Sequence, residues 1–329
     1  MKRDLVETIT AMQGKKILVV GDMVADIYLN GQIARISREA PVLVLDYQGE
    51  KVVAGGAANV VNNLATLGGQ VFALGVLGDD HGAGGLREIL AGNGADVTGL
   101  ITAPQRPTIS KTRVVAGGRA TVSQQIVRID RETKEPIGTA EEEKLLARIK
   151  ELLPKAQGVV LSDYGSGTIT EKIKNELITG AKRRRLPSIV DSRYDIMRFK
   201  GVSFVKQNDA ELSAAVGRTF NNAEDIYDAG QELLTNMGAE GVLVTRGEQG
   251  MTLLEKDGAI HHIPVADKSE VFDVSGAGDT CVATMILALA AGVEPVAAAE
   301  LSNIAAGIAV RKLGTATVSQ EELRRAVCR

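Results

Sequence analysis

Six apolar runs of strand length, separated by stretches with helical periodicity, are the feature that most limits the folds open to this chain. The runs begin with KILVVG at Lys16 and continue as QVFALGVLG, GVVLSD, PSIVD, VSFVK and GVLVT. Runs that are apolar throughout are typical of parallel strands buried on both faces. The pattern therefore predicts an α/β fold, a doubly wound, mainly parallel sheet flanked by helices.

Helical spacing fills the intervals between these runs. Apolar positions follow it over 57–67, and Gly68 is placed to end that helix. Further helices are predicted over 82–92, 140–153, 170–185, 222–238, 278–292, 295–312 and 319–327.

Two stretches, 28–52 and 108–130, interrupt the alternation. They contain LVLDYQGEKVV and SKTRVVAGGRATVSQQIVRID, whose polar and apolar residues alternate as in half-exposed strands. We expect the two stretches to meet as one small antiparallel β lid. The α/β core would then consist of 1–27, 53–107 and 131–329.

Charge and composition exclude several classes of partner. Lys and Arg number 38 against 41 Asp and Glu, so no basic field is available to attract nucleic acid or an anionic membrane. The longest apolar run, 281–293, is too short to cross a bilayer. The two cysteines, Cys281 and Cys328, form neither a disulfide framework nor a metal-ligand spacing. We therefore expect a cytoplasmic protein with no nucleic-acid or membrane partner.

The strongest local motif is VFDVSGAGDTCVATMILALAAG, from Val271 to Gly292, in which a glycine-rich turn opens into an apolar helix. The amides of Gly276, Ala277 and Gly278 would point out of the helix N-terminus, where the helix dipole favours an anion. Asp279 next to a bound phosphate is suited to taking a hydroxyl proton during phosphoryl transfer. A capping turn with an acidic first-turn residue has the same pattern, so this alternative stays open.

Other phosphate-binding motifs are missing. No GxxxxGK[ST] sequence occurs and no GxGxxG follows the first strand, which removes the main support for a P-loop NTPase or a classical dinucleotide-binding domain. A second glycine-rich segment instead places Gly55, Gly56 and Asn59 at the start of the first amphipathic helix. These residues, with Asp26 after the first strand, could bind a hydroxylated ligand. A tight turn and a solvated loop acid are the alternatives.

Two weaker elements complete the set. Asn208 and Glu211 are three residues apart at the start of a helix, so they share a face suited to a hydrated Mg²⁺. Thr245, Gly247 and Gly250 form a loop at a strand end that could hold nucleotide phosphates or ribose. A plain hairpin turn would look the same.

Taken together, these residues resemble the ribokinase family of sugar kinases, also called the PfkB family. The resemblance is carried by AGGAANVVNNLATLGG, NDAE, TRGEQG and DVSGAGDT, in this order along the chain. It implies a ribokinase-like fold and transfer of a phosphoryl group from ATP, with Mg²⁺, to a sugar. It makes Asp279 the base and residues 276–278 the anion hole, and it adds Asn303 to the nucleotide pocket.

Within the family, ARISREAPVLVL, PTISKTRVV, LSDYGSG and VRKLGTATVS are similar to the heptose-7-phosphate kinase branch, the kinase half of the bifunctional ADP-heptose synthesis enzyme. The resemblance implies D-glycero-D-manno-heptose 7-phosphate as substrate and its anomeric hydroxyl as acceptor. Lys111 and Arg113 would bind the 7-phosphate, with Gln125 and Arg128 as further candidates. The chain departs from the branch at Ser166 and at Asp191-Ser192-Arg193.

Two alternatives to this function remain at the level of sequence. The chain could be a kinase for another sugar, phosphosugar or nucleoside, or a sugar-binding regulator without catalysis. The apolar residues of QQIVRID fall on both faces of its strand, and relatives often pair through this lid, which predicts a homodimer.

Overall fold

The computed structural model describes residues 2–118, 122–265 and 271–328. Its main sheet has nine strands in the order β13-β12-β11-β10-β9-β8-β1-β4-β5. Seven neighbouring strands are parallel, and β12 and β13 add an antiparallel edge. The strand bounds are β1 Lys16–Gly21, β4 Gln70–Leu77, β5 Asp96–Thr102, β8 Gly158–Asp163, β9 Ser188–Ser192, β10 Phe204–Asn208, β11 Gly241–Thr245, β12 Met251–Glu255 and β13 Ile260–Ile263.

Helices cover both faces of this sheet. One core contains α1 Lys2–Ala11, α2 Ala57–Thr66, α3 His81–Gly92, α8 Ala277–Ala290, α9 Pro295–Ala309 and α10 Gln320–Cys328. The other core contains α4 Thr139–Leu152, α5 Glu171–Arg184, α6 Asp209–Val216 and α7 Ala223–Met237. Short 3₁₀ turns lie at Leu153–Lys155, Ile196–Phe199 and Gly247–Gln249.

The side chains of β1 show why the predicted runs form central strands. Ile17 and Val19 pack into the first core, and Leu18 and Val20 pack into the second, all fully buried. Because side chains alternate between faces, a strand covered on both sides has to be apolar at every position. The predicted α/β fold is confirmed.

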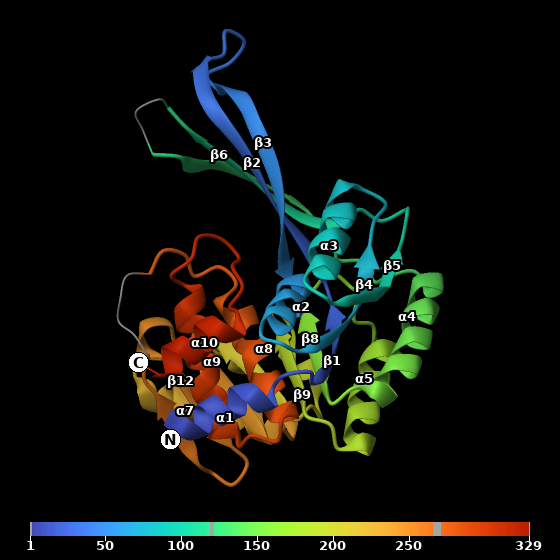
Figure 1. The fold of residues 1–329 in the computed structure, drawn as a ribbon, viewed down its shortest axis with the longest axis vertical. Coiled ribbons are helices and arrows are strands. Elements are labelled where there is room, and N and C mark those ends of the chain that lie inside the picture. Colours follow the sequence, from blue (N-terminus) through green and yellow to red (C-terminus); the bar gives the residue numbers. More distant parts are fainter. Residues whose placement is uncertain (1, 119–121, 266–270, 329) are drawn as a thin grey trace.

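The lid is a separate four-stranded sheet in the order β3-β2-β6-β7. Its strands are β2 Met23–Ile36, β3 Leu43–Gly56, β6 Ile109–Gly117 and β7 Gln124–Arg131. The pairs β2–β3 and β6–β7 are antiparallel, as expected, and a parallel pairing of β2 with β6 joins them. Figure 1 shows the β2–β3 ribbon extending far beyond the helices of the core.

The lid strands begin and end close to the limits derived from the sequence. β2 starts five residues before position 28, and β3 runs four residues past position 52, because the ribbon continues into the core beside α2 and α3. The division into core and lid at the stated limits remains a prediction. Among the described helices, none is long and apolar enough to cross a membrane.

Candidate functional site

Two cavities border the N-terminus of α8, and different residues of its first turn line each one. The large cavity has a volume of about 730 Å³ and is lined by Ala277 and Gly278. The small cavity has a volume of about 170 Å³ and is lined by Gly276 and Asp279. Ligands bound in the two cavities would therefore meet at the first turn of α8.

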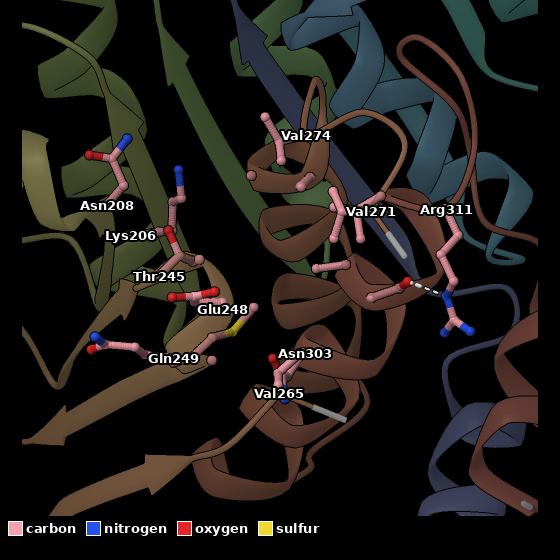
Figure 2. A pocket seen from close by; sticks show the side chains of 18 residues that line it. Lys206, Asn208, Thr245, Glu248, Gln249, Val265, Val271, Val274, Asn303 and Arg311 are labelled. Atoms are coloured by element: carbon pink, nitrogen blue, oxygen red, sulfur yellow. Dashed lines mark hydrogen bonds between the residues drawn. The ribbon is translucent and has the colours of Figure 1, made fainter. Parts of the chain in front are cut away.

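The large cavity has a polar wall and an apolar wall. Lys206 and Asn208 from β10 and Thr245 from the end of β11 form the polar wall, and Val271 and Val274 lie across from them (Figure 2). Its volume is within the range of roughly 300–1,000 Å³ that is typical of small-molecule sites. Such a cavity can hold a flat apolar ring system at one side and a charged group at the other.

The predicted loop residues also lie in the large cavity. Gly247 and Gly250 belong to the turn after β11, and Asn303 projects from α9. The Asn303 side chain donates from Nδ2 to the carbonyl of Pro264 at 2.6 Å, so it braces the segment after β13. The structure thus brings predicted residues from β10, the turn after β11, α8 and α9 together in one cavity.

Asp279 is the third residue of α8 and is only 5% exposed. Its Oδ2 accepts a hydrogen bond from Asn59 Nδ2 at 2.8 Å, and its Oδ1 accepts one from the Tyr164 hydroxyl at 2.9 Å. Burial raises the pKa of Asp279 to about 7, and the hydrogen bond from Asn59 opposes that rise. A carboxyl with a pKa near neutrality is suited to act as a general base.

The turn before α8 brings its backbone close to the base. Gly276 caps the helix with a φ of 80°, and a Cβ at this position would lie 2.6 Å from Asn59 Nδ2. Only glycine combines this conformation with this close approach. The amide of Ala277 contacts the carbonyl of Val274 at 3.3 Å. Among the described residues, no carbonyl accepts from the amides of Gly276 and Gly278, so these remain available to an anion.

A buried lysine stands beside the same turn. Lys206 Nζ is 3.0 Å from Asp191 Oδ2 and 3.9 Å from Glu211 Oε2, and a Cβ at Gly278 would lie 2.8 Å from this ammonium. Burial alone would lower the pKa of Lys206, but the two carboxylates raise it above its ordinary value. A fixed positive charge therefore lies next to the free helix amides, where negative charge can be stabilised.

Asn208 and Glu211 form a reciprocal cap at the start of α6. Asn208 Oδ1 accepts from the Glu211 amide at 2.7 Å, and Glu211 Oε2 accepts from the Asn208 amide at 2.8 Å. The other carboxylate oxygen of Glu211 takes no part in this cap. No cluster of three or more His, Cys, Asp or Glu surrounds one point in the described segments. A hydrated Mg²⁺, which takes few protein ligands, is compatible with this donor set.

The small cavity lies under the lid and is lined by basic side chains. Arg113 Nη1 donates to Asp26 Oδ1 at 2.7 Å, and Arg128 pairs with Asp130 at 2.8 Å. Burial lowers the pKa of Arg113, but the bond to Asp26 raises it above its ordinary value. Lys111 and Arg193 line the same cavity. Neither forms an ion pair within the described ranges.

Residues 14–322 match the model of the pfkB family carbohydrate kinases. The chain belongs to this family. It is a sugar kinase, as the sequence motifs predicted, and the predicted ribokinase-like fold is confirmed by the solved structures described next.

The solved structures share the fold of this kinase at low identity. Arabidopsis thaliana ribokinase complexed with ribose and ATP has a TM-score of 0.73 at 20% identity, covering 96% of this chain and 99% of that one. Phosphofructokinase-2 from Escherichia coli in complex with substrates and products has a TM-score of 0.76 at 21% identity, with coverages of 95% and 98%.

The curated relatives are much more similar in sequence. Bifunctional protein HldE from Geobacter metallireducens is 42% identical over 98% of the kinase, and the one from Paramagnetospirillum magneticum is 42% identical over 97%. The kinase spans 65% and 64% of the length of these two relatives. The similarity to these HldE proteins supports the heptose-7-phosphate kinase branch that the sequence blocks indicated.

Most site residues predicted from the sequence of this pfkB kinase line the two cavities. The large cavity contains Asn208, Thr245, Gly247, Gly250, Ala277, Gly278 and Asn303. The small cavity contains Asp26, Gly56, Lys111, Arg113, Arg128, Gly276 and Asp279.

Four predicted residues of the kinase line neither cavity. Asn59 instead holds Asp279, and Glu211 caps α6 beside Lys206. A Cβ at Gly55 would lie 2.7 Å from Asp26 Oδ2, so this glycine makes room for the carboxylate. Gln125 is exposed on β7, three residues from Arg128 and beside a β-bulge, so the structure does not bring it to the cavity that Arg128 lines.

Sequence reasoning missed three residues of the site, namely Lys206, Tyr164 and Arg193. Lys206 lies in the middle of the buried strand β10, and Tyr164 directly follows the buried strand β8. A charged or phenolic side chain within or next to an apolar run could have been recognised as unusual. Arg193 was noted only as a departure from the family pattern. The guanidinium carbon of Arg193 lies 5.9 Å from the centre of the neighbouring Tyr194 ring.

Proposed function

We propose that this sugar kinase transfers the γ-phosphoryl group of ATP to the anomeric hydroxyl of a heptose 7-phosphate, D-glycero-D-manno-heptose 7-phosphate. The observation that carries the proposal is the charge of the small cavity. Four basic side chains line it, and two of them, Lys111 and Arg193, have no acidic partner among the described residues. A cavity with this excess of positive charge favours a sugar that carries a phosphate.

The sequence blocks of the heptose kinase branch and the HldE relatives support the same substrate. In this assignment Asp26 and the backbone at Gly56 contact sugar hydroxyls at the foot of the lid, and Gly55 leaves the space that the Asp26 carboxylate occupies. Lys111, Arg113, Arg193 and Arg128 surround the 7-phosphate. Asn59 acts on the sugar indirectly, through the Asp279 carboxylate that it holds.

The nucleotide would occupy the large cavity, with its base against the valines and its phosphates near α8. Thr245, Gly247, Gly250 and Asn303 would hold the nucleoside and the first phosphates. Asn208 and Glu211 would hold Mg²⁺ through its water shell. When bound, Mg²⁺ neutralises negative charge on the phosphate oxygens.

The chain's own groups account for the transfer step. The anomeric oxygen forms a bond to the γ-phosphorus, the bond from that phosphorus to the β–γ bridging oxygen breaks, and ADP leaves with the electron pair. Asp279 takes the hydroxyl proton. Lys206 and the amides of Gly276 and Gly278 stabilise charge on the transferred group, because they are already fixed beside its path.

A coupled assay of ADP formation over a panel of sugars tests the proposal. We expect the highest kcat/KM with heptose 7-phosphate and a value lower by about 10-fold or more with heptose itself, because the charge-assisted contacts to the phosphate are lost. Equal values for the two sugars would contradict the assignment. A higher value with a nucleoside or with a different phosphosugar would identify one of the alternative kinases.

Arg193→Ala provides the matching variant. It should raise KM for heptose 7-phosphate by about 10- to 100-fold and leave KM for unphosphorylated heptose nearly unchanged. Arg183→Ala on the exposed end of α5 is the control for loss of one arginine. An equal increase in KM for both sugars in Arg193→Ala would show that this side chain only supports the loop after β9.

We also propose that the kinase is a homodimer paired through its lid. Every residue of β7 is exposed, and Val127 and Ile129 keep 47% and 59% of their surface in solvent. Apolar strand surface of this kind is typical of an interface. Light scattering with size exclusion should give about twice the chain mass of 34.7 kDa.

The matched variant for the dimer is Val127→Glu, which should reduce the mass to that of a monomer because it buries a charge between the lids. Glu143→Gln, at an exposed position of α4, serves as the control for a change of one charge. A dimer that survives Val127→Glu and Ile126→Glu does not pair through β7.

A further inference from the structure

The segment after β8 carries a tyrosine directly to the base of the proposed reaction. Tyr164 follows the last residue of β8, and its hydroxyl donates to Asp279 Oδ1 at 2.9 Å. The same side chain lines the small cavity. Asn59 donates to the other carboxylate oxygen at 2.8 Å from the opposite element, α2. The carboxylate is therefore held at both oxygens by neutral donors.

The backbone that carries Tyr164 is fixed by a fully buried carboxylate, that of Asp22. Asp22 Oδ2 accepts from the amides of Tyr164 at 2.8 Å and Ser166 at 3.0 Å, and its Oδ1 accepts from Thr168 at 3.2 Å. A carboxylate bound to three backbone amides of one loop holds that loop in one conformation. Ser166 is buried in this loop, and its backbone amide is one of the groups that bind Asp22.

Two further contacts hold the same loop from its outer side. Asp163 Oδ1 accepts from the amide of Gly165 at 3.2 Å, and the Arg106 guanidinium donates to the carbonyls of Ser166 and Glu135. These bonds connect the loop to the segment before α4 and to the end of β8. The position of the Tyr164 hydroxyl is thus set by the surrounding framework rather than by the ligand.

We propose that Tyr164 is a positioning residue that keeps the Asp279 carboxylate ionised and oriented for proton removal from the sugar. The inference rests on the proposed function, in which Asp279 is the base. Removal of the hydroxyl would leave Oδ1 facing a buried, apolar edge of the ring. The carboxylate would then be less stable relative to the protonated acid.

The charges around Asp279 explain why a donor is needed. Asp191 on β9 opposes ionisation of Asp279, and Lys206 on β10 favours it. The lid contributes Asp26, Arg113, Lys111 and Arg128 to the cavity wall, and Arg193 lies on the core side. Burial raises the pKa of Tyr164 well above its ordinary value, so the phenol is protonated and is a hydrogen-bond donor near neutral pH.

Tyr164→Phe tests the inference with the best sugar substrate of the unchanged protein. Loss of a hydrogen bond to the ionised form raises the pKa of Asp279, so the acidic limb of the kcat/KM profile should move to higher pH by about one unit. The rate should fall by about 10-fold on the acid side of the limb and recover toward the unchanged value on the plateau. A fall by one constant factor at every pH would overturn the inference.

Tyr194→Phe is the matched control. Tyr194 is exposed and its ring packs against Gly165 of the same loop, but it makes no hydrogen bond to Asp279. Loss of the Tyr194 hydroxyl should leave the acidic limb of the kcat/KM profile at the same pH. Equal melting temperatures of the two phenylalanine variants show that Tyr164→Phe is folded.

A second readout does not depend on activity. In protein labelled with ¹³C at aspartate carboxyls, the Asp279 resonance is identified by its absence in Asp279→Asn, and it should titrate at higher pH in Tyr164→Phe. An unchanged titration overturns the inference alone. Full activity of Asp279→Asn would instead contradict the proposed function, and the inference with it.

Discussion

Replacement of Asp279 with asparagine is expected to lower kcat by a factor on the order of 10² or more, while the affinity for ATP stays near that of the unchanged protein. The amide has the size of the carboxyl and can still accept from Asn59, so the geometry at the start of α8 is retained. It cannot take a proton from a sugar hydroxyl. Ala277, Gly278 and Lys206, which face the nucleotide side, are unaltered.

Steady-state kinetics with titration calorimetry for ATP separates these two effects. Asp228→Asn, at an exposed position of α7, is the control for loss of one carboxylate. An Asp279→Asn protein that retains most of its turnover would show that the residue is only the first-turn acid of a capped helix. A large loss of ATP affinity would point to a collapse of the first turn of α8.

Lys206→Met is expected to cost both stability and turnover. The ammonium pairs with the buried Asp191 at 3.0 Å and lies 3.9 Å from Glu211, so its removal leaves the Asp191 carboxylate without its ion-pair partner. Breaking a buried ion pair in this way costs about 3–5 kcal/mol of unfolding free energy. Loss of the fixed charge beside the helix amides should also lower kcat by about 10²–10³.

Denaturant unfolding and kinetics of the double variant Lys206→Met with Asp191→Asn distinguish these two roles. Neutralising the partner should recover much of the stability, because no unpaired charge remains in the pair. Turnover should stay low, since the positive charge is still missing. Lys256→Met, in the exposed turn after β12, is the control. A double variant as unstable as Lys206→Met alone would contradict the pairing argument.

The central strands and most helices were predictable because burial on both faces leaves a simple apolar signal. α1 was not predicted, although Leu5, Ile9 and Met12 follow helical spacing and are buried. The polar residues of α1 hid the apolar stripe that these three positions form. The edge strands β5 and β13 were also missed, because an edge strand is partly exposed and its pattern does not differ from that of a loop. The buried strand β12, which lies between β13 and β11, was missed as well.

The site was predictable where its residues are adjacent in sequence. The glycine turn and Asp279 form one motif, and the structure places cavities on both sides of it. Lys206 and Tyr164 could not be assigned in this way. Their roles depend on the carboxyl ends of β8 and β10 reaching the same sheet edge as the start of α8, which is a property of strand order rather than of any local segment.

The first turn of α8 also imposes a constraint on chain length. Gly276 and Asp279 face one cavity, and Ala277 and Gly278 face the other. The remainder of the helix is buried and cannot rotate to compensate for a change at its start. Because each residue turns an α-helix by about 100°, inserting or deleting one residue between 276 and 279 would change the groups that the first turn presents to the two cavities. This segment should therefore accept some substitutions over evolutionary time but no insertions or deletions.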